Sequence, residues 1–227
     1  MNNRRIGKRV KRIPTGSNAL DGLLGGGIEA GSVTLFYGEA GSGKSNICLQ
    51  IACNVIRGGQ KVAYVDTEGL SVDRVHQIFK DDSLINGLLV FQVHSFKEQS
   101  ERVEQIVRIA RNGLLGLIVV DSMTMFYRLN YDNMLMRSDF VKQTETLLNL
   151  AREYEVPVLM TSQVYTNIQT GSIEFLGGHA MHHNAKTIIK LILRGNGMRS
   201  AVIVKHRSLP EGREAMFRIT EDGIRDQ

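Results

Sequence analysis

The stretch from Gly38 to Ser45 constrains this chain more than any other. It reads GEAGSGKS and fits GxxxxGK[ST], the pattern of a phosphate-binding loop. Residues 32–37 before it are short, apolar and β-prone, and residues 46–57 after it lack Gly and Pro and are apolar at helical spacing. A glycine-rich turn that matched by chance would not need this strand–loop–helix context. The sequence therefore predicts a nucleoside triphosphate site.

The residue types of the loop suit a triphosphate. Glycines let the backbone wrap closely around phosphates, so that successive N–H groups and the N-terminus of the next helix face the anion. Lys44 adds a cation near the β- and γ-phosphates, and the Ser45 hydroxyl can ligate Mg²⁺. The predicted nucleotide ligands are Gly38, Glu39, Ala40, Gly41, Ser42, Gly43, Lys44, Ser45 and Asn46.

Two acids follow apolar strands further along the chain. Asp121 closes the run LIVVD at 117–121 and is predicted to hold the Mg²⁺ shell through water or Ser45; the alternative is an acid that caps a buried strand end. Glu68 lies after the second expected strand, at the sheet edge where doubly wound folds place ligands. It could deprotonate the attacking water, but its position alone leaves a solvated loop acid equally open.

Apolar strands and amphipathic helices alternate along most of the chain. Strands are expected at 32–37, 61–66, 88–94, 117–121 and 156–162, and helices at 46–57, 71–80, 97–112 and 140–154. Unbroken apolar strands separated by helices predict a parallel sheet buried on both faces. In the tail, residues 186–194 and 200–206 flank a Gly-Asn-Gly turn, which indicates an antiparallel hairpin, and 214–219 can add a strand. The fold class is α/β, with a mostly parallel sheet flanked by helices.

The formal net charge of the chain is +5, and its charged residues are unevenly distributed along the sequence. The first twelve residues contain no acid, whereas the remainder carries 22 of the 28 Lys and Arg and all 23 acids. We therefore expect a basic arm at 1–12 and one core domain at 13–227. The arm suggests a polyanion partner, with a solvated terminus as the equal alternative. Its basic residues are Arg4, Arg5, Lys8, Arg9, Lys11 and Arg12.

The remaining composition favours an intracellular, cytoplasmic protein. No apolar run approaches the length of a membrane span, and no signal peptide opens the chain. Cys48 and Cys53 fall five positions apart on one expected helix, so they do not share a face and are interpreted as reduced core cysteines.

Residues 177–183 read GGHAMHH and bring together His179, His182 and His183. Three histidines could ligate a structural metal, but no Cys, and no acid closer than Glu174, accompanies them. The alternative is that His179 senses the γ-phosphate while the other two lie at the surface.

Several segments in order carry a resemblance to the RecA/RadA recombinase core. They are TGSNALDGLLGGGIEAGSVTLFYGEAGSGKS, YVDTEG, LIVVDS, TSQV, GGHAMHH and LPEGREAMFRITEDGI, and they span residues 13–226. The resemblance, close to archaeal RadA, implies a RecA-like ATPase core that works with ATP and Mg²⁺ on single-stranded or branched DNA in recombination and repair. It also implies partners such as RadA or a junction resolvase, and a possible homo-oligomer.

Individual residues take roles from this resemblance. Asp121 matches the Walker B acid and Glu68 the family's catalytic glutamate. Arg74 matches an arginine that stacks on adenine, and Gln163 matches the glutamine that couples the γ-phosphate to the second DNA loop. His179 follows the matching glycine pair. The first DNA loop, around 128–139, keeps Arg128 and Arg137 as DNA contacts.

The sequence also departs from the recombinases. The helix-hairpin-helix domain and the Phe-bearing linker that builds filaments are expected to be missing, because only the basic arm precedes the core. The second DNA loop, 165–176, has no Lys or Arg and one acid, so it is a poor surface for strand exchange. For a chain with these departures, the resemblance implies a weak ATPase that binds DNA as an accessory and uses ATP as a switch. The alternatives are an active, DNA-stimulated strand-exchange recombinase and, more distantly, a KaiC-like regulatory ATPase.

Overall fold

The computed structural model describes residues 10–129, 133–166 and 173–227. The helices are α1 (Asn18–Leu23), α2 (Lys44–Arg57), α3 (Val72–Phe79), α4 (Asp82–Ile85), α5 (Phe96–Ala110), η1 (Tyr127–Leu129), α6 (Met134–Tyr154) and α7 (Gly178–Asn184). The strands up to residue 121 are β1 (Arg12–Ile13), β2 (Ile28–Glu29), β3 (Val33–Gly38), β4 (Lys61–Asp66), β5 (Leu88–Gln92) and β6 (Leu115–Asp121). Those after it are β7 (Val158–Ser162), β8 (Val164–Thr166), β9 (Ile173–Phe175), β10 (Thr187–Gly195), β11 (Met198–Lys205), β12 (Glu214–Thr220) and β13 (Gly223–Asp226).

One nine-stranded sheet organises these elements, in the order β13-β12-β11-β10-β3-β7-β6-β4-β5. The six strands from β10 to β5 are parallel to one another, and β10 to β13 are joined by antiparallel pairings. This confirms the predicted fold class, including the antiparallel hairpin, which forms as β10 and β11. Because β10 also pairs with β3, the C-terminal strands extend the parallel sheet.

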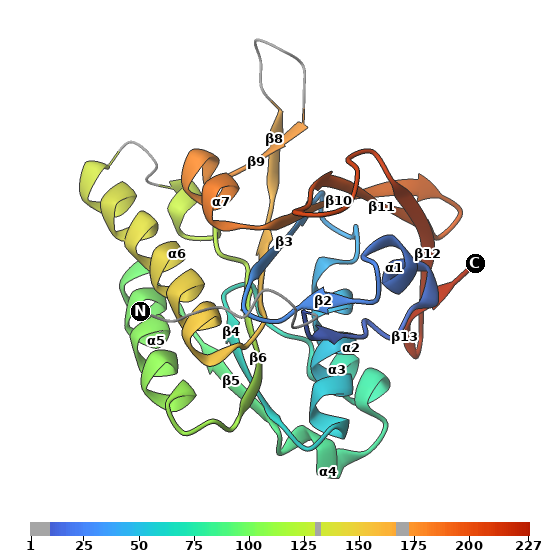
Figure 1. Cartoon of the computed structure of the whole chain (residues 1–227), viewed down its shortest axis with the longest axis horizontal. Helices are drawn as coiled ribbons and strands as arrows, with labels where there is room; N and C mark the ends of the chain where they lie inside the picture. The colour runs from blue at the N-terminus through green and yellow to red at the C-terminus, as the bar shows by residue number, and fades with distance from the viewer. Residues whose placement is uncertain (1–9, 130–132, 167–172) are drawn as a thin grey trace.

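Helices cover both faces of the parallel strands (Figure 1). Alternate side chains of each strand enter different cores, as the period of two in a strand requires. Phe36, Tyr64 and Val119 pack with α2 and α3, whereas Leu35 and Val65 pack with α5 and α6. Two-sided burial explains why these strands are apolar without interruption.

Two expected boundaries are wrong, both near the predicted DNA loops. Helix α6 begins at Met134 instead of 140, because the Asn133 side chain accepts from the N–H groups of Leu135 and Met136 and caps the helix. The expected first loop, 128–139, is therefore helical from Met134 onward. In the expected second loop, 165–176, β8 and β9 pair as a two-stranded antiparallel ribbon. Residues 167–172, between these two strands in the sequence, lie outside the described ranges.

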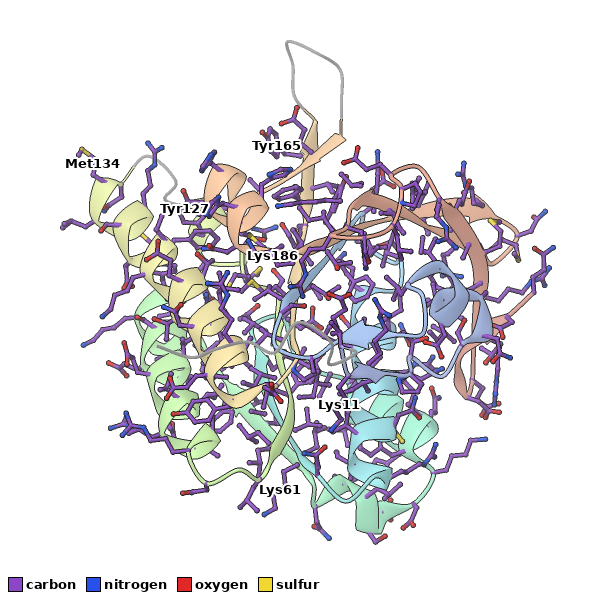
Figure 2. All side chains as sticks on the ribbon, in the orientation of Figure 1. Lys11, Lys61, Tyr127, Met134, Tyr165 and Lys186 are labelled. Carbon is purple, nitrogen blue, oxygen red and sulfur yellow. The ribbon has the colours of Figure 1, made fainter. Side chains whose placement is uncertain are left out.

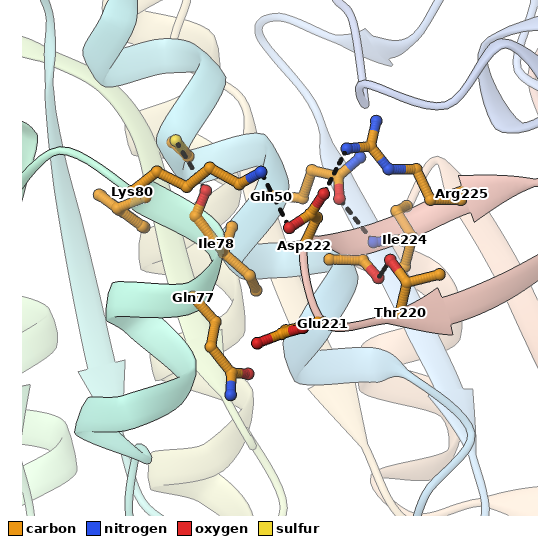
Figure 3. Close-up of polar contacts among 12 residues, drawn as sticks. Gln50, Gln77, Ile78, Lys80, Thr220, Glu221, Asp222, Ile224 and Arg225 are labelled. Carbon is orange, nitrogen blue, oxygen red and sulfur yellow. Dashed lines mark hydrogen bonds and ion pairs between the residues drawn. The ribbon is translucent and has the colours of Figure 1, made fainter.

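Polar contacts join the C-terminal turn to α2 and to the end of α3 (Figure 3). Lys80 Nζ on the α3 C-cap lies 2.8 Å from Asp222 Oδ1, and the Ile224 N–H donates to Gln50 Oε1 of α2 at 2.7 Å. The first contact joins the last strands to α3, and the second joins them to α2, the helix that carries Lys44. Within the described ranges, we find no helix with the length and apolar character of a membrane span.

Candidate nucleotide-binding site

The glycine loop connects β3 to α2 with the backbone that an anion cradle requires. Gly41 has φ +77° and Gly43 has φ +104°, a left-handed region in which side chains are strained. Gly43 is the N-cap of α2 and has no side-chain acceptor, so it makes no capping hydrogen bond to the first N–H groups of this 14-residue helix. The helix start can therefore donate to an anion.

Gly38 is required for a different reason, the close approach of the neighbouring strand. A Cβ at this position would lie 2.4 Å from the carbonyl oxygen of Leu191 in β10 and 2.8 Å from Ser42 Oγ. The Ser42 hydroxyl is fully buried and has no hydrogen-bond partner among the described residues. An unpaired buried hydroxyl is costly, so a ligand that supplied an acceptor here would be stabilised.

Lys44 points back over the loop. Its Nζ donates to the carbonyl oxygens of Gly38 at 2.8 Å and Glu39 at 3.0 Å. Burial lowers the pKa of Lys44, and the negative charges of Glu68 and Asp121 partly offset this effect. A triphosphate would offer the ammonium group a charged acceptor in place of neutral carbonyls.

Asp121 is held in place by two strands beside its own. Tyr64 Oη donates to Asp121 Oδ2 at 2.7 Å, and Thr161 Oγ1 donates to Oδ1 at 2.5 Å. The pKa of Tyr64 is raised well above its usual value, first by burial and then by the charge of Asp121, so the phenol stays protonated as a donor. The sequence analysis missed Tyr64 and Thr161, because their place inside apolar strands gave no specific signal.

A second aspartate, also missed, shapes the Glu68 loop. The Asp66 carboxylate accepts from the N–H groups of Glu68, Gly69 and Leu70 at 3.2, 2.9 and 2.7 Å. Three backbone donors on one carboxylate fix the turn that presents Glu68. The sequence did contain a signal for Asp66, because it is an acid at the C-terminal end of an apolar strand, β4, two residues before Glu68.

Residues of the phosphate loop, of α2 and of the Glu68 loop line a cavity of about 180 Å³, together with Asp121. It is lined by Ser45, Asn46, Leu49, Asp66, Glu68, Gly69, Leu70, Ser71, Arg74 and Asp121. The Ser45 hydroxyl and the Asp121 carboxylate are oxygen donors of the kind that Mg²⁺ prefers, so the residues fit the predicted ion. The cavity thus combines Ser45, Asn46, Glu68, Arg74 and Asp121, which the sequence analysis had placed together.

Arg74 borders this cavity and is fixed by several acceptors. Its Nε donates to Asn46 Oδ1 at 2.5 Å, and its two terminal nitrogens donate to the carbonyls of Glu221 and Thr220, each at 2.8 Å. Burial lowers the pKa of Arg74 and the Asp222 charge opposes the shift. The C-terminal turn therefore holds the guanidinium group next to the phosphate-binding helix.

Three other predicted residues line a larger groove, of about 790 Å³. Its lining includes Arg128, Arg137 and His179, together with the rings of Tyr127, Phe140, Tyr165 and Phe175. Figure 2 shows Tyr127, Met134 and Tyr165 at the same end of the molecule. His179 lines this groove and not the smaller cavity, which Glu68 and Asp121 line.

Gln163 follows β7 and lies between the two cavities. Its Nε2 donates to Glu68 Oε1 at 2.9 Å, and its Oε1 accepts from an Arg128 terminal nitrogen at 2.5 Å. Gln163 is therefore in direct contact with the predicted catalytic glutamate, although 95 positions separate them.

The histidine segment forms α7. The rings of His179 and His183 stack with centroids 6.0 Å apart. Burial lowers the pKa of His182, as does the nearby Lys205. Among the described residues, no three His, Cys, Asp or Glu side chains converge as a metal site.

Cys48 and Cys53 are free and buried in α2.

The basic arm is described only at its end. Arg4, Arg5, Lys8 and Arg9 lie outside the described residues, and Lys11 is exposed. Arg12 belongs to β1, and its guanidinium lies 2.7 Å from the buried Glu29 carboxylate, which also bonds to Arg207. Arg12 is therefore engaged in the body of the protein, because β1 pairs with β2.

A glycine loop between β3 and α2, an acid at the end of β6 beside it and a mostly parallel sheet define a P-loop NTPase core with the RecA-like fold. Comparison with known proteins agrees, since a family model described as Rad51 matches residues 6–227. The chain belongs to the Rad51 family, and this confirms the resemblance to RecA/RadA recombinases.

Individual relatives cover nearly the whole chain. The DNA repair and recombination protein RadB of Methanococcoides burtonii is 43% identical over 212 residues, which cover 91% of this chain and 94% of that protein. The protein of the same name from Archaeoglobus fulgidus is 40% identical over 216 residues, covering 93% and 97%. A structure described as the crystal structure of the RadB recombinase has a TM-score of 0.85 at 34% identity, covering 95% of this chain and 99% of that one.

Proposed function

We propose that this protein is an ATP-binding, weakly ATP-hydrolysing accessory of homologous recombination and DNA repair that binds DNA without exchanging strands. The observation that carries the proposal is the smaller cavity, in which Ser45, Glu68 and Asp121 face one another beside the loop of Lys44. The names of the RadB relatives support the recombination and repair setting.

In this proposal the chain's own residues position ATP and the attacking water. Lys44 and the loop N–H groups bind the phosphates, and Arg74 packs on the adenine. Ser45 and Asp121 would hold Mg²⁺, which when bound neutralises charge on the β- and γ-phosphate oxygens. Glu68 takes the proton of the water. Slow turnover suits a switch, in which the ATP-bound and ADP-bound states differ in their affinity for DNA.

The absence of strand exchange is inferred from charge. Residues 165–176 contain no Lys or Arg, whereas phosphate contacts dominate DNA affinity. Arg128 and Arg137 line the larger groove and are proposed as DNA contacts, with the arm residues as a further, sequence-independent contact. The second candidate, an active strand-exchange recombinase, is favoured by the Rad51 family match, and a KaiC-like regulator is the more distant one.

The proposed setting is the cytoplasm, with DNA, RadA and a junction resolvase as partners and with self-association as a possible state. The proposed division of the chain is a basic arm at 1–12 and one ATPase core at 13–227.

The proposal is tested by measuring nucleotide binding and turnover separately. Lys44→Ala should weaken ATP binding by about 10- to 150-fold, the range for loss of one hydrogen bond to a charged group. Glu68→Gln should bind ATP as the wild type does and lose turnover, because an amide cannot accept the proton. Equal turnover in the wild type and Glu68→Gln would remove Glu68 from the mechanism.

Strand exchange is assayed with matched oligonucleotides at the same protein concentrations. Efficient, ATP-dependent exchange by the protein alone would contradict the accessory role and favour the active recombinase.

A further inference from the structure

The C-terminal strands reach the phosphate loop itself. Strand β10 pairs with β3 as far as Gly38, the first residue of the loop, which lies opposite Leu191. A Cβ on Gly43, at the other end of the loop, would lie 3.3 Å from Phe217 Cε2 and 3.3 Å from Ile219 Cδ1, both in β12. Both ends of the loop therefore pack against the C-terminal part of the sheet.

Between these ends, an arginine of β11 contacts the middle of the loop. Arg199 Nε donates to the Gly41 carbonyl oxygen at 3.2 Å, across 158 positions. A terminal nitrogen of the same side chain donates to the Gly197 carbonyl oxygen at 2.6 Å, in the turn between β10 and β11. Arg199 lies opposite Phe217 in the register of β11 with β12, and opposite side chains leave a sheet on the same face. The face of the sheet that packs on Gly43 thus also presents Arg199.

The contact falls where the loop has the most freedom to lose. Gly41 is exposed with φ +77°, and glycine loses more conformational freedom on ordering than any other residue. The Ser42 N–H, on the same peptide unit as the Gly41 carbonyl, donates to the Glu39 carbonyl oxygen at 3.2 Å. Arg199 and Glu39 therefore hold the two polar groups of one peptide unit and fix its orientation.

The orientation of this peptide unit matters for an anion cradle, which is made of successive backbone N–H groups. A loop that is ordered before its ligand arrives binds more tightly, because less conformational entropy is lost on binding. The guanidinium group suits this task, since its donors have fixed directions and can bridge the loop and the hairpin turn.

We propose that Arg199 is a positioning residue of the phosphate loop, which holds the Gly41–Ser42 peptide unit in the orientation that receives the phosphates of a nucleotide. Both of its acceptors are carbonyl oxygens of the chain, so the role does not require contact with the ligand. The inference rests on the proposed nucleotide binding. It extends the site from the loop and the acids at the strand ends to the hairpin of β10 and β11.

Calorimetric titration of Arg199→Ala with ATP, ADP and inorganic tripolyphosphate, each with Mg²⁺, tests this role. The Kd for each ligand should rise about 2- to 13-fold, the effect of losing one ordinary hydrogen bond. The factor should be the same for all three ligands, because the loop wraps around phosphates that they share. A rise for ATP with no rise for ADP would mean that Arg199 contacts the γ-phosphate, and would overturn the positioning role.

Turnover separates an effect on the loop from an effect on the chemistry. Arg199→Ala should raise KM for ATP by the same factor as Kd and leave kcat at saturating ATP unchanged, because the loop binds substrate and transition state alike. A lower kcat with an unchanged KM would place Arg199 in the chemical step and contradict the proposal.

Arg194→Ala is the matched control. Arg194 lies in β10 of the same hairpin and carries the same charge, but it donates to Ser200 Oγ at 2.9 Å and pairs with Glu214. Its Kd values should equal those of the wild type. An equal loss in Arg194→Ala and Arg199→Ala would mean that the charge of the hairpin, and not the bond to Gly41, sets the affinity.

Urea unfolding of the ligand-free proteins shows whether each variant is folded. Arg199→Lys keeps a cationic donor and should show a smaller rise in Kd than Arg199→Ala; it replaces the alanine variant in every titration if that variant does not fold.

The outcomes separate the two proposals. A wild type that binds neither ATP nor tripolyphosphate would contradict the proposed function. A wild type that binds both, together with a folded Arg199→Ala variant of equal affinity for all three ligands, would overturn the role of Arg199 alone.

Discussion

The hydrogen bond between Tyr64 and Asp121 makes a quantitative prediction about stability. Tyr64 is fully buried, and its hydroxyl donates to Asp121 Oδ2 at 2.7 Å. Tyr64→Phe keeps the ring and removes only this donor, so it leaves part of a buried carboxylate unpaired. A hydrogen bond to a charged group contributes about 1.5–3 kcal/mol, and we expect the free energy of unfolding at pH 8 to fall by this amount.

The same residue predicts how the difference depends on pH. Burial, followed by the Asp121 charge, raises the folded-state pKa of Tyr64 well above 10.0, whereas an unfolded tyrosine ionises near its ordinary value. Below pH 10 both states are protonated and the full contribution is present. Above pH 10 the unfolded state loses its proton and is favoured, so the wild type loses about 1.4 kcal/mol per pH unit relative to Tyr64→Phe. The two proteins should be equally stable by about pH 11–12.

Urea unfolding at pH 8 and pH 11, followed by circular dichroism, measures both effects. The chain contains no Trp, so the backbone signal is the suitable one. The midpoint should fall with an unchanged m-value. Tyr154→Phe, at the end of α6 with a half-buried ring, is the control and should change stability by less than about 0.5 kcal/mol. Equal losses in both variants, or a Tyr64→Phe difference that is the same at pH 8 and pH 11, would refute the reasoning.

Three further predictions concern ligands. Elemental analysis of the purified protein should find no stoichiometric zinc; one zinc per chain that His179→Ala removes would establish a metal site at α7. Arg74→Ala should weaken ATP binding by about 2- to 30-fold, the range of a cation–π contact, and should leave the affinity for inorganic tripolyphosphate unchanged. An equal loss of affinity for both ligands would exclude an adenine contact. Deletion of residues 1–11 removes five cations and spares the Arg12–Glu29 pair. The slope of log K for single-stranded DNA against log salt concentration should become less steep by about 3.5. An unchanged slope would mean that the arm does not contact DNA.

The sequence by itself was sufficient for features that depend on neighbouring residues. The phosphate loop could be located because glycine tolerance, the Lys44 cation and the start of α2 all lie within a few consecutive positions. Strands β4 and β6 could be recognised from their apolar composition. The acids at their ends followed, because parallel strands bring their C-terminal ends to one edge of a sheet.

Contacts between distant positions were decided by the tertiary structure alone. Tyr64 and Thr161 lie 57 and 40 positions from Asp121, and they meet it only because β4, β6 and β7 are adjacent in the sheet. Apolar periodicity indicates which face of a strand is buried but carries no information on which strand lies beside it. The same limit hid the bond between Gln163 and Arg128.

Local patterns also failed where a distant partner changed a residue's role. In the sequence, Arg12 is one of six equivalent cations of the arm, but pairing of β1 with β2 commits it to the buried carboxylate of Glu29. Helix α6 starts six residues before its apolar pattern does, because the Asn133 cap and not burial begins it, and its first turn is exposed at Met134 and Leu135. Composition records charge and polarity, whereas the fold decides whether a charged group faces solvent or a buried partner, since burial makes an unpaired charge costly.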